Sequence, residues 1–70
     1  MRMRNVVVST LSEEAFVEIL SKLETLGANV VEKRYDLLYK RYEIYAKANH
    51  RQCYKLRRFV KSYNASLMEL

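Results

Sequence analysis

The sequence predicts an α+β fold with the element order β-α-β-β-α, in which a three-stranded, antiparallel-type sheet carries two helices on one face. Three observations favour this class. Residues 5–10 form a β-branched run, residues 12–26 and 49–63 place apolar side chains at helical spacing, and residues 29–48 between them alternate like strands. At 70 residues, the chain is expected to form a single domain, 1–70.

The first strand is expected from Asn5 to Thr10, which reads NVVVST. Three consecutive valines favour a strand with both faces covered, so it should lie inside the sheet. Arg2 and Arg4 alternate with Met1 and Met3 ahead of this strand. These four residues either extend the strand or form a loose basic arm.

The first helix is expected from Ser12 to Leu26. Its N-cap is either Ser12 or Thr10, because Thr10 and Glu13 have the spacing of a capping box. Gly27, the only glycine, follows as the expected C′ residue. The apolar positions of this helix fall on one stripe: Phe16, Val17, Ile19, Leu20, Leu23 and Leu26.

The other face of this helix is polar, and we interpret its charge as solvation. Glu18 and Lys22 stand at i,i+4 and should form an ion pair. Glu14 and Glu18 are a pair of carboxylates, but no further ligand or acid converges on them at a metal-binding or catalytic spacing.

Residues 29–48 allow two interpretations, and the choice between them decides the fold. In the first, a hairpin turns near Leu38 to Arg41, because the alternation of apolar residues changes phase there. Its apolar faces are Val31, Tyr35, Leu37 and Tyr39 on the first strand, and Tyr42, Ile44, Ala46 and Ala48 on the second.

In the second interpretation, residues 29–48 form one helix. Asn29 is then the N-cap with Glu32 at N3, and an apolar stripe runs through Val31, Tyr35, Leu38, Tyr42 and Tyr45. We favour the hairpin because Tyr, Val and Ile dominate the apolar positions, and because Asn49 has the features of a new helix cap.

The last helix is expected to begin after Asn49, whose capping-box partner is Gln52, and to run to about Tyr63. Its apolar stripe comprises Cys53, Leu56, Phe59, Val60, Tyr63 and Leu67. The opposite side projects Arg51, Tyr54, Lys55 and Arg58. Residues 64–70 should continue this helix for another turn or two.

The order strand, helix, hairpin, helix resembles a ferredoxin-like unit that lacks its last strand. With the helical interpretation of residues 29–48, the chain instead resembles the ribbon-helix-helix family of DNA-binding proteins, with MRMRNVVV as the ribbon. That family pairs its N-terminal strands between two chains. The first resemblance rests on element order and implies no particular activity.

Positive charge is concentrated in the second half of the chain. Residues 1–29 carry three Lys or Arg and four acids, whereas residues 30–70 carry ten Lys or Arg and four acids, within a formal net charge of +5. Such a distribution indicates a polyanionic partner, usually nucleic acid, although basic surfaces also bind acidic proteins.

The candidate site follows from the spacing of these cations. Arg51, Lys55 and Arg58 form one row along the last helix, with Tyr54 beside them, and a tyrosine ring can stack on a base while cations bind phosphates. A second basic cluster flanks the expected hairpin tip. The candidate nucleic-acid-binding residues are Arg51, Tyr54, Lys55, Arg58, Lys33, Arg34, Lys40 and Arg41. A solvated helix face without a ligand would show the same pattern.

Three function classes stay open, and an enzyme is the least favoured. The chain has one histidine, His50, and one cysteine, Cys53, which falls on the apolar stripe, so we expect no catalytic residue, metal or cofactor. We expect a regulatory or nucleic-acid-binding module, or else a small inhibitor or adaptor that docks on an acidic protein surface. The remaining expectations are a homodimer in the cytoplasm, with neither a membrane nor a small-molecule substrate as partner.

Overall fold

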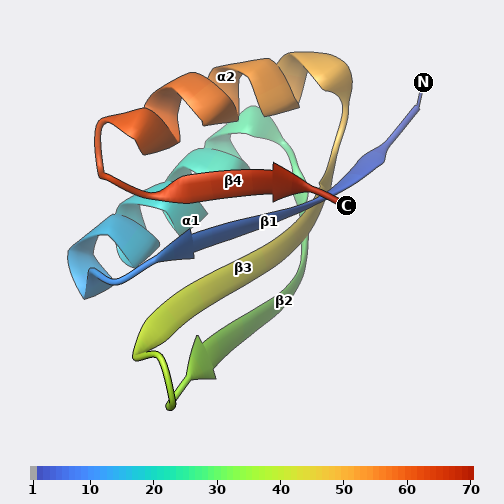
Figure 1. Ribbon diagram of the computed structural model, residues 1–70. Helices are drawn as coiled ribbons and strands as arrows, with labels where there is room; N and C mark the ends of the chain where they lie inside the picture. Colours follow the sequence, from blue (N-terminus) through green and yellow to red (C-terminus); the bar gives the residue numbers. More distant parts are fainter. Residues whose placement is uncertain (1) are drawn as a thin grey trace.

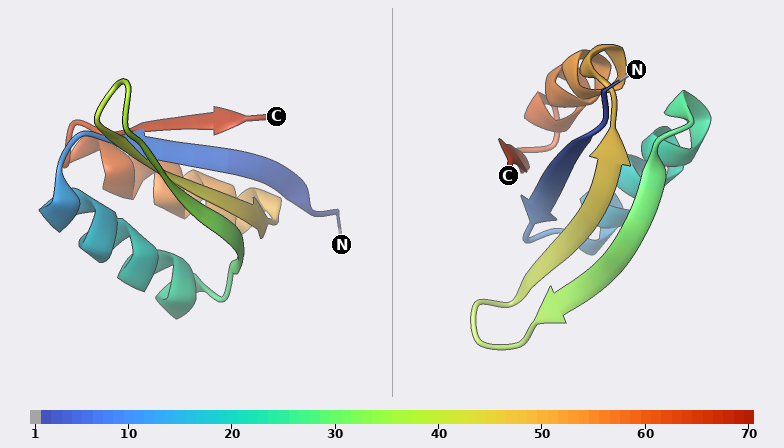
Figure 2. Two further views of the ribbon diagram at one scale, coloured as in Figure 1. Left: turned by 90° about the horizontal axis from the view of Figure 1, so that it is seen from below. Right: turned by 90° about the vertical axis from the view of Figure 1, so that its right-hand side faces the viewer.

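The computed structural model describes residues 2–70, which form six elements in the order β-α-β-β-α-β (Figure 1). They are β1 (Arg4–Thr10), α1 (Glu13–Leu26), β2 (Asn29–Asp36), β3 (Arg41–Ala48), α2 (His50–Lys61) and β4 (Ser66–Glu69). The strands form one antiparallel sheet in the order β2-β3-β1-β4, and both helices cover the same face (Figure 2). The α+β, ferredoxin-like class is therefore confirmed, with one strand more than the sequence predicted.

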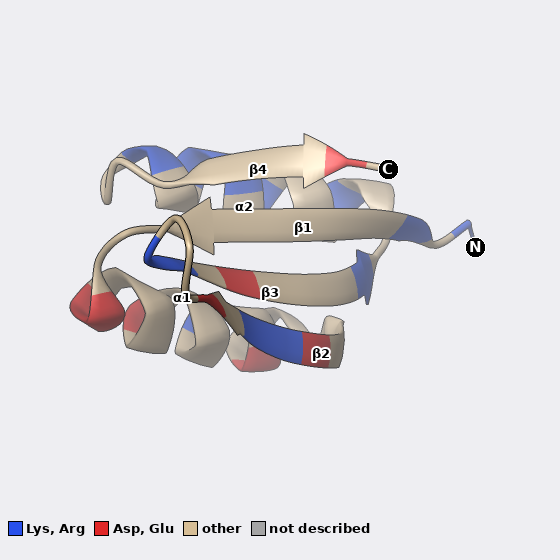
Figure 3. Ribbon diagram, turned by 60° about the horizontal axis from the view of Figure 1, so that its bottom comes forward, with Lys and Arg blue, Asp and Glu red and all other residues tan. Residues whose placement is uncertain are grey.

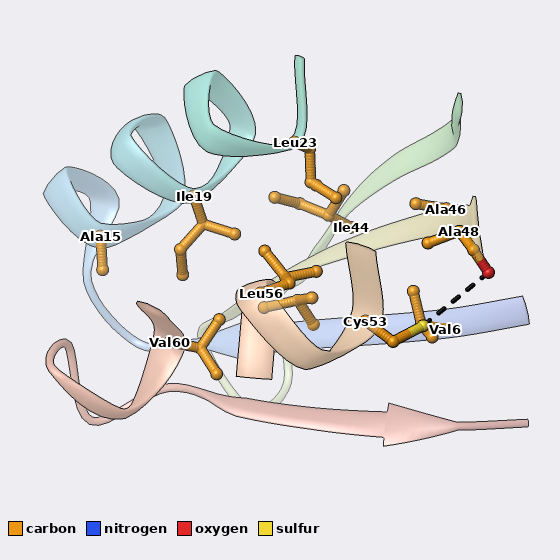
Figure 4. Packing of buried hydrophobic residues seen from close by; sticks show 11 residues of the cluster. Val6, Ala15, Ile19, Leu23, Ile44, Ala46, Ala48, Cys53, Leu56 and Val60 are labelled. Carbon is orange, nitrogen blue, oxygen red and sulfur yellow. Dashed lines mark hydrogen bonds between the residues drawn. The ribbon is translucent and has the colours of Figure 1, made fainter. Parts of the chain in front are cut away.

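The core lies between the sheet and the two helices (Figure 4). Alternate residues of the central strands point into it, with Val6 and Val8 from β1 and Ile44 and Ala46 from β3. The helices add Ala15, Ile19, Leu23, Cys53, Leu56 and Val60. Because β1 lies between β3 and β4, the predicted inner strand is confirmed.

The ends of both helices are fixed by local hydrogen bonds. Ser12 caps α1, since its Oγ accepts a hydrogen bond from Ala15 N at 3.2 Å, and Gly27 ends the helix at φ 78°. Thr10 is not the cap; its Oγ1 accepts from Ser12 N instead. At α2 the predicted capping box is present, because Asn49 and Gln52 each accept from the other's backbone N at 2.8 Å.

Residues 29–48 form the predicted hairpin, so the one-helix interpretation and the ribbon-helix-helix alternative are wrong. The loop covers residues 37–40 rather than 38–41. Asp36 Oδ1 accepts hydrogen bonds from Leu38 N at 3.0 Å and Tyr39 N at 3.2 Å, and Lys40 adopts φ 52°. An aspartate side chain and one left-handed residue thus make the turn without glycine or proline.

The predicted apolar face of β2 is only partly correct. A bulge between Val30 and Glu32 turns Val31 outward, where it is 57% exposed, and Val30 packs on the core instead. Tyr35 does face the helix side, with its ring centroid 4.7 Å from that of Tyr42. Leu37 and Tyr39 lie beyond the strand, in the loop.

The helical continuation predicted for residues 64–70 is also wrong. The helix ends at Lys61, Asn64 adopts φ 54°, and the chain turns back as β4 beside β1. Leu67 then pairs with Val8 on the helix side of the sheet. Glu69 holds β4 in place through Arg4 at 3.1 Å and Arg57 at 2.6 Å.

Arg4 opens β1, so the strand extends by one residue toward the basic N-terminal segment. Arg2 and Met3 precede the strand, and Met1 lies outside the described residues. Within residues 2–70, no helix is both long enough and apolar enough to cross a membrane.

Candidate functional site

Lys and Arg residues recur along α2 (Figure 3). Its inner face buries Cys53, Leu56 and Val60, and the helical period therefore places the cations on the opposite side. Arg51, Tyr54, Lys55 and Arg58 are all exposed, as the sequence predicted. No carboxylate among residues 2–70 forms an ion pair with Arg51, Lys55 or Arg58.

The two helices run antiparallel, and side chains near the C-terminal end of α1 contact α2. There Gln52 Nε2 donates a hydrogen bond to Leu26 O at 2.8 Å. Further along, Lys22 Nζ lies 5.3 Å from the centroid of the Phe59 ring. This packing brings a cation of α1 beside the basic row of α2.

The result is a shallow, open groove of about 600 Å³ between the helices, which we call the basic groove. It is lined by Lys22, Tyr54, Lys55, Arg58, Phe59 and Ser62. The Arg58 guanidinium lies 6.0 Å from the Tyr54 ring centroid, and Tyr54 is 58% exposed. The groove thus combines three positive charges with an accessible aromatic ring.

Lys22 is the groove cation that the sequence did not predict, and Phe59 and Ser62, which also line the groove, were not among the predicted site residues. The expected ion pair between Glu18 and Lys22 does not form, because the ammonium group of Lys22 lies against Phe59. The i,i+4 spacing to Glu18 had explained Lys22 as one half of a surface ion pair within α1. Only the packing of α1 against α2 shows that it belongs to the groove.

The other half of the interhelical surface is acidic. A neighbouring hollow of about 630 Å³ is lined by Glu13, Glu14, Val17, Glu18 and Tyr63. The acidic residues of α1 are concentrated in its first half (Figure 3), and there they line the hollow next to the basic groove. A bound polyanion is expected to occupy the basic half only.

The hairpin cations lie on the opposite edge of the sheet from β4, and so on a different surface from the basic groove. Two of them are engaged within the hairpin. Arg34 pairs with Glu32 and lies 5.5 Å from the Tyr45 ring, and Arg41 lies 3.9 Å from Glu43. Lys33 and Lys40 are exposed. The predicted site residues therefore form two separate groups.

Metal-binding and nucleophilic groups are not gathered on either surface. Residues 2–70 contain no group of three or more His, Cys, Asp or Glu side chains placed to hold a metal ion. Cys53 is buried, its Sγ lies 3.8 Å from Ala48 O, and burial raises the pKa of its thiol (Figure 4). A buried thiol of this kind is a core residue.

The fold is shared with solved structures of low sequence identity. Two formyltetrahydrofolate deformylases, from Pseudomonas putida and Burkholderia mallei, align with TM-scores of 0.66 at 11% and 13% identity, over 99% and 97% of this chain. The chain spans only 28% and 27% of those two proteins. An uncharacterized protein from Thermotoga maritima aligns with a TM-score of 0.60 at 11% identity, over 99% of both chains.

No family model and no curated protein matches the sequence. At these identities the structural likeness shows the fold alone. A function must therefore be inferred from the chemistry of the basic groove and not from these likenesses.

Proposed function

We propose that this chain is a non-enzymatic binding module that holds a single strand of nucleic acid in the basic groove. The observation that supports this proposal is that Lys22, Lys55 and Arg58 line one groove together with an exposed tyrosine ring. None of these three cations is neutralised by an ion pair within residues 2–70. Their charges are free to bind phosphates.

The tyrosine favours a single strand over a duplex. Surfaces that bind single strands combine a cationic groove for the backbone with aromatic side chains on which bases stack. The exposed ring of Tyr54 lies beside the Arg58 guanidinium and offers such a stacking surface. In a duplex the bases are already stacked on one another, so this ring would add little.

We further propose that the module works in the cytoplasm and as a homodimer.

The hairpin cations are not part of the proposed nucleic-acid surface, because they lie across the sheet from β4 and two of them are paired with carboxylates. Of the residues expected from the sequence, the proposed site keeps Tyr54, Lys55 and Arg58 and gains Lys22, whereas Arg51 lines a different hollow with Arg2 and Arg4.

The test is a salt titration of binding to labelled single-stranded DNA and RNA, followed by fluorescence anisotropy. The variant Lys22→Gln/Lys55→Gln/Arg58→Gln should bind more weakly. Its plot of log K against log salt should be shallower by about 2, since each phosphate contact on a single strand contributes about 0.7.

The matched control is Lys33→Gln/Lys40→Gln/Lys47→Gln, which removes the same charge from exposed hairpin positions. It should keep the slope of the wild type. An equal loss in both variants would show that only net charge matters, and the basic groove would not be the site. If the wild type binds no strand at low salt, the alternative of an acidic protein partner is preferred.

A further inference from the structure

The tip of the β2–β3 hairpin presents three consecutive apolar or aromatic side chains to solvent. Leu37, Leu38 and Tyr39 are 81%, 80% and 63% exposed. The loop projects beyond the rest of the sheet and away from the helices (Figure 1, Figure 2). These side chains contribute nothing to the core, and a cluster of exposed apolar residues at a projecting point marks an interaction site.

Cations lie directly behind this apolar tip. Lys40 and Arg41 follow it in the chain, and the Arg41 guanidinium lies 5.3 Å from the centroid of the Tyr39 ring. Lys33 and Arg34 lie on the other strand of the hairpin, shortly before it ends at Asp36. The tip is thus layered, with apolar groups outermost and positive charge behind them.

The negative charges of the hairpin are already engaged. Asp36 accepts hydrogen bonds from two backbone N–H groups of the loop. Glu32 pairs with Arg34, and Glu43 lies 3.9 Å from Arg41. Of these three carboxylates only Asp36 has no cationic partner among residues 2–70, and its Oδ1 is oriented toward the loop backbone.

We propose that this tip inserts shallowly into an anionic lipid bilayer. A bilayer has the complementary layering, since negatively charged headgroups overlie an apolar interior, and tyrosine is favoured at the boundary between them. The two leucines enter the acyl region, while Lys33 and Lys40, which form no ion pair within residues 2–70, remain among the headgroups. This departs from the sequence-based expectation that no membrane is a partner.

The proposed nucleic-acid site leaves the tip free for this role. The basic groove lies between α1 and α2, whereas the hairpin forms the edge of the sheet opposite β4. A tip with two leucines gives weak and reversible attachment, as expected of a single small anchor supported by a few cations. The tip therefore recruits the protein to a membrane surface rather than anchoring it permanently.

A tryptophan reporter tests insertion directly, because the chain contains no tryptophan. The emission of a Leu38→Trp variant should shift to shorter wavelength on phosphatidylcholine vesicles that contain phosphatidylglycerol. Leu70→Trp is the control, since Leu70 is 72% exposed and lies at the opposite end of the sheet from the loop. No shift for Leu38→Trp, or the same shift for both variants, would overturn the proposal.

Vesicle sedimentation gives a second measurement that does not depend on tryptophan. Leu37→Ser/Leu38→Ser should weaken binding to the anionic vesicles about tenfold or more. Met68→Ser/Leu70→Ser, which changes two other exposed apolar residues, should leave it unchanged. Binding of the wild type should fall with added salt and on neutral vesicles.

Two other results would overturn the proposal in favour of another partner. If Leu37→Ser/Leu38→Ser abolishes binding to duplex DNA but not to vesicles, the tip acts as a wedge between base pairs. If it abolishes self-association without lipid, the tip binds a second copy of the chain. The double change lies in an exposed loop, so circular dichroism should show that it folds like the wild type.

Discussion

Lys22 Nζ lies 5.3 Å from the centroid of the Phe59 ring, and this contact joins α1 to α2 beside the basic groove. Phe59 is consequently shared between two environments. It is half-buried against the core, its ring centroid lies 5.2 Å from that of Tyr63, and it also lines the groove. From the apolar stripe in the sequence, Phe59 and Leu56 were expected to be buried alike. In the structure Leu56 is completely buried and Phe59 is not.

This difference predicts unequal costs of truncation. Leu56→Ala should lower the free energy of unfolding by about 2 to 5 kcal/mol, because it leaves a cavity in the closed core. Phe59→Ala should cost less, about 1 to 3 kcal/mol, since water can fill the space on the groove side. Urea unfolding of the two variants checks the order, and a larger cost for Phe59→Ala would place its ring in the core.

Tyr54 is predicted to act by stacking. Tyr54→Ala should weaken binding to a single strand by about 1 to 3 kcal/mol for each stacked base and should change duplex binding much less. Tyr54→Phe keeps the ring and should bind like the wild type. Anisotropy titrations with both substrates measure these effects, and equal losses for Phe and Ala would assign the contribution to the hydroxyl group instead.

The parts of the fold that local signals determine could be predicted from the sequence. Ser12, Gly27 and Asn49 mark helix ends because their side chains or backbone conformations act within a few residues. The hairpin could be recognised from the phase change near Tyr39, where four loop residues interrupt two alternating strands.

The strand β4 and the groove position of Lys22, which the sequence did not predict, depend on contacts between distant segments of the chain. Leu67 stands four residues after Tyr63 and so continues the helical stripe, but in the structure it fills a position beside Val8 of β1. Lys22 likewise had a local partner in Glu18, and its position against Phe59 depends on how two helices pack. Both contacts join segments that are far apart in the sequence. Residue spacing within one segment therefore indicated a nearby partner instead of the actual one in each case.

Backbone conformation predicts two opposite effects on stability. Gly27 has φ 78°, and a Cβ there would meet only Gln52 Nε2 at 3.7 Å, an ordinary contact. Gly27→Ala should therefore cost about 1 to 2 kcal/mol through the left-handed backbone alone. Lys40 has φ 52°, so Lys40→Gly should relieve a similar strain and raise or preserve stability. Thermal unfolding checks both, and stabilisation by Gly27→Ala would contradict this account.

We propose that β2 forms the interface of the homodimer. It is an edge strand of eight residues, and it exposes Val31 and Tyr35, which are 57% and 46% exposed. Sedimentation equilibrium should give about twice the chain mass of 8.4 kDa. Val31→Lys should restore the single chain, whereas Met68→Lys, on β4, should not. A mass of one chain for the wild type at micromolar concentration would exclude the dimer.

The acidic first half of α1 should limit how a polyanion occupies the interhelical surface. Glu14 and Glu18 line the hollow beside the basic groove, so they repel phosphates that extend past its end. Glu14→Gln/Glu18→Gln should raise the affinity for a single strand about fourfold at low salt, taking roughly twofold for a charge about 10 Å away in water. The gain should disappear near 1 M salt, where the screening length is about 3 Å. Glu32→Gln/Glu43→Gln makes the same charge change in the hairpin and serves as the control. An equal gain in affinity for both variants would reflect net charge alone. A loss of affinity for Glu14→Gln/Glu18→Gln would mean that these two carboxylates contact the ligand, and the ligand would then not be a polyanion.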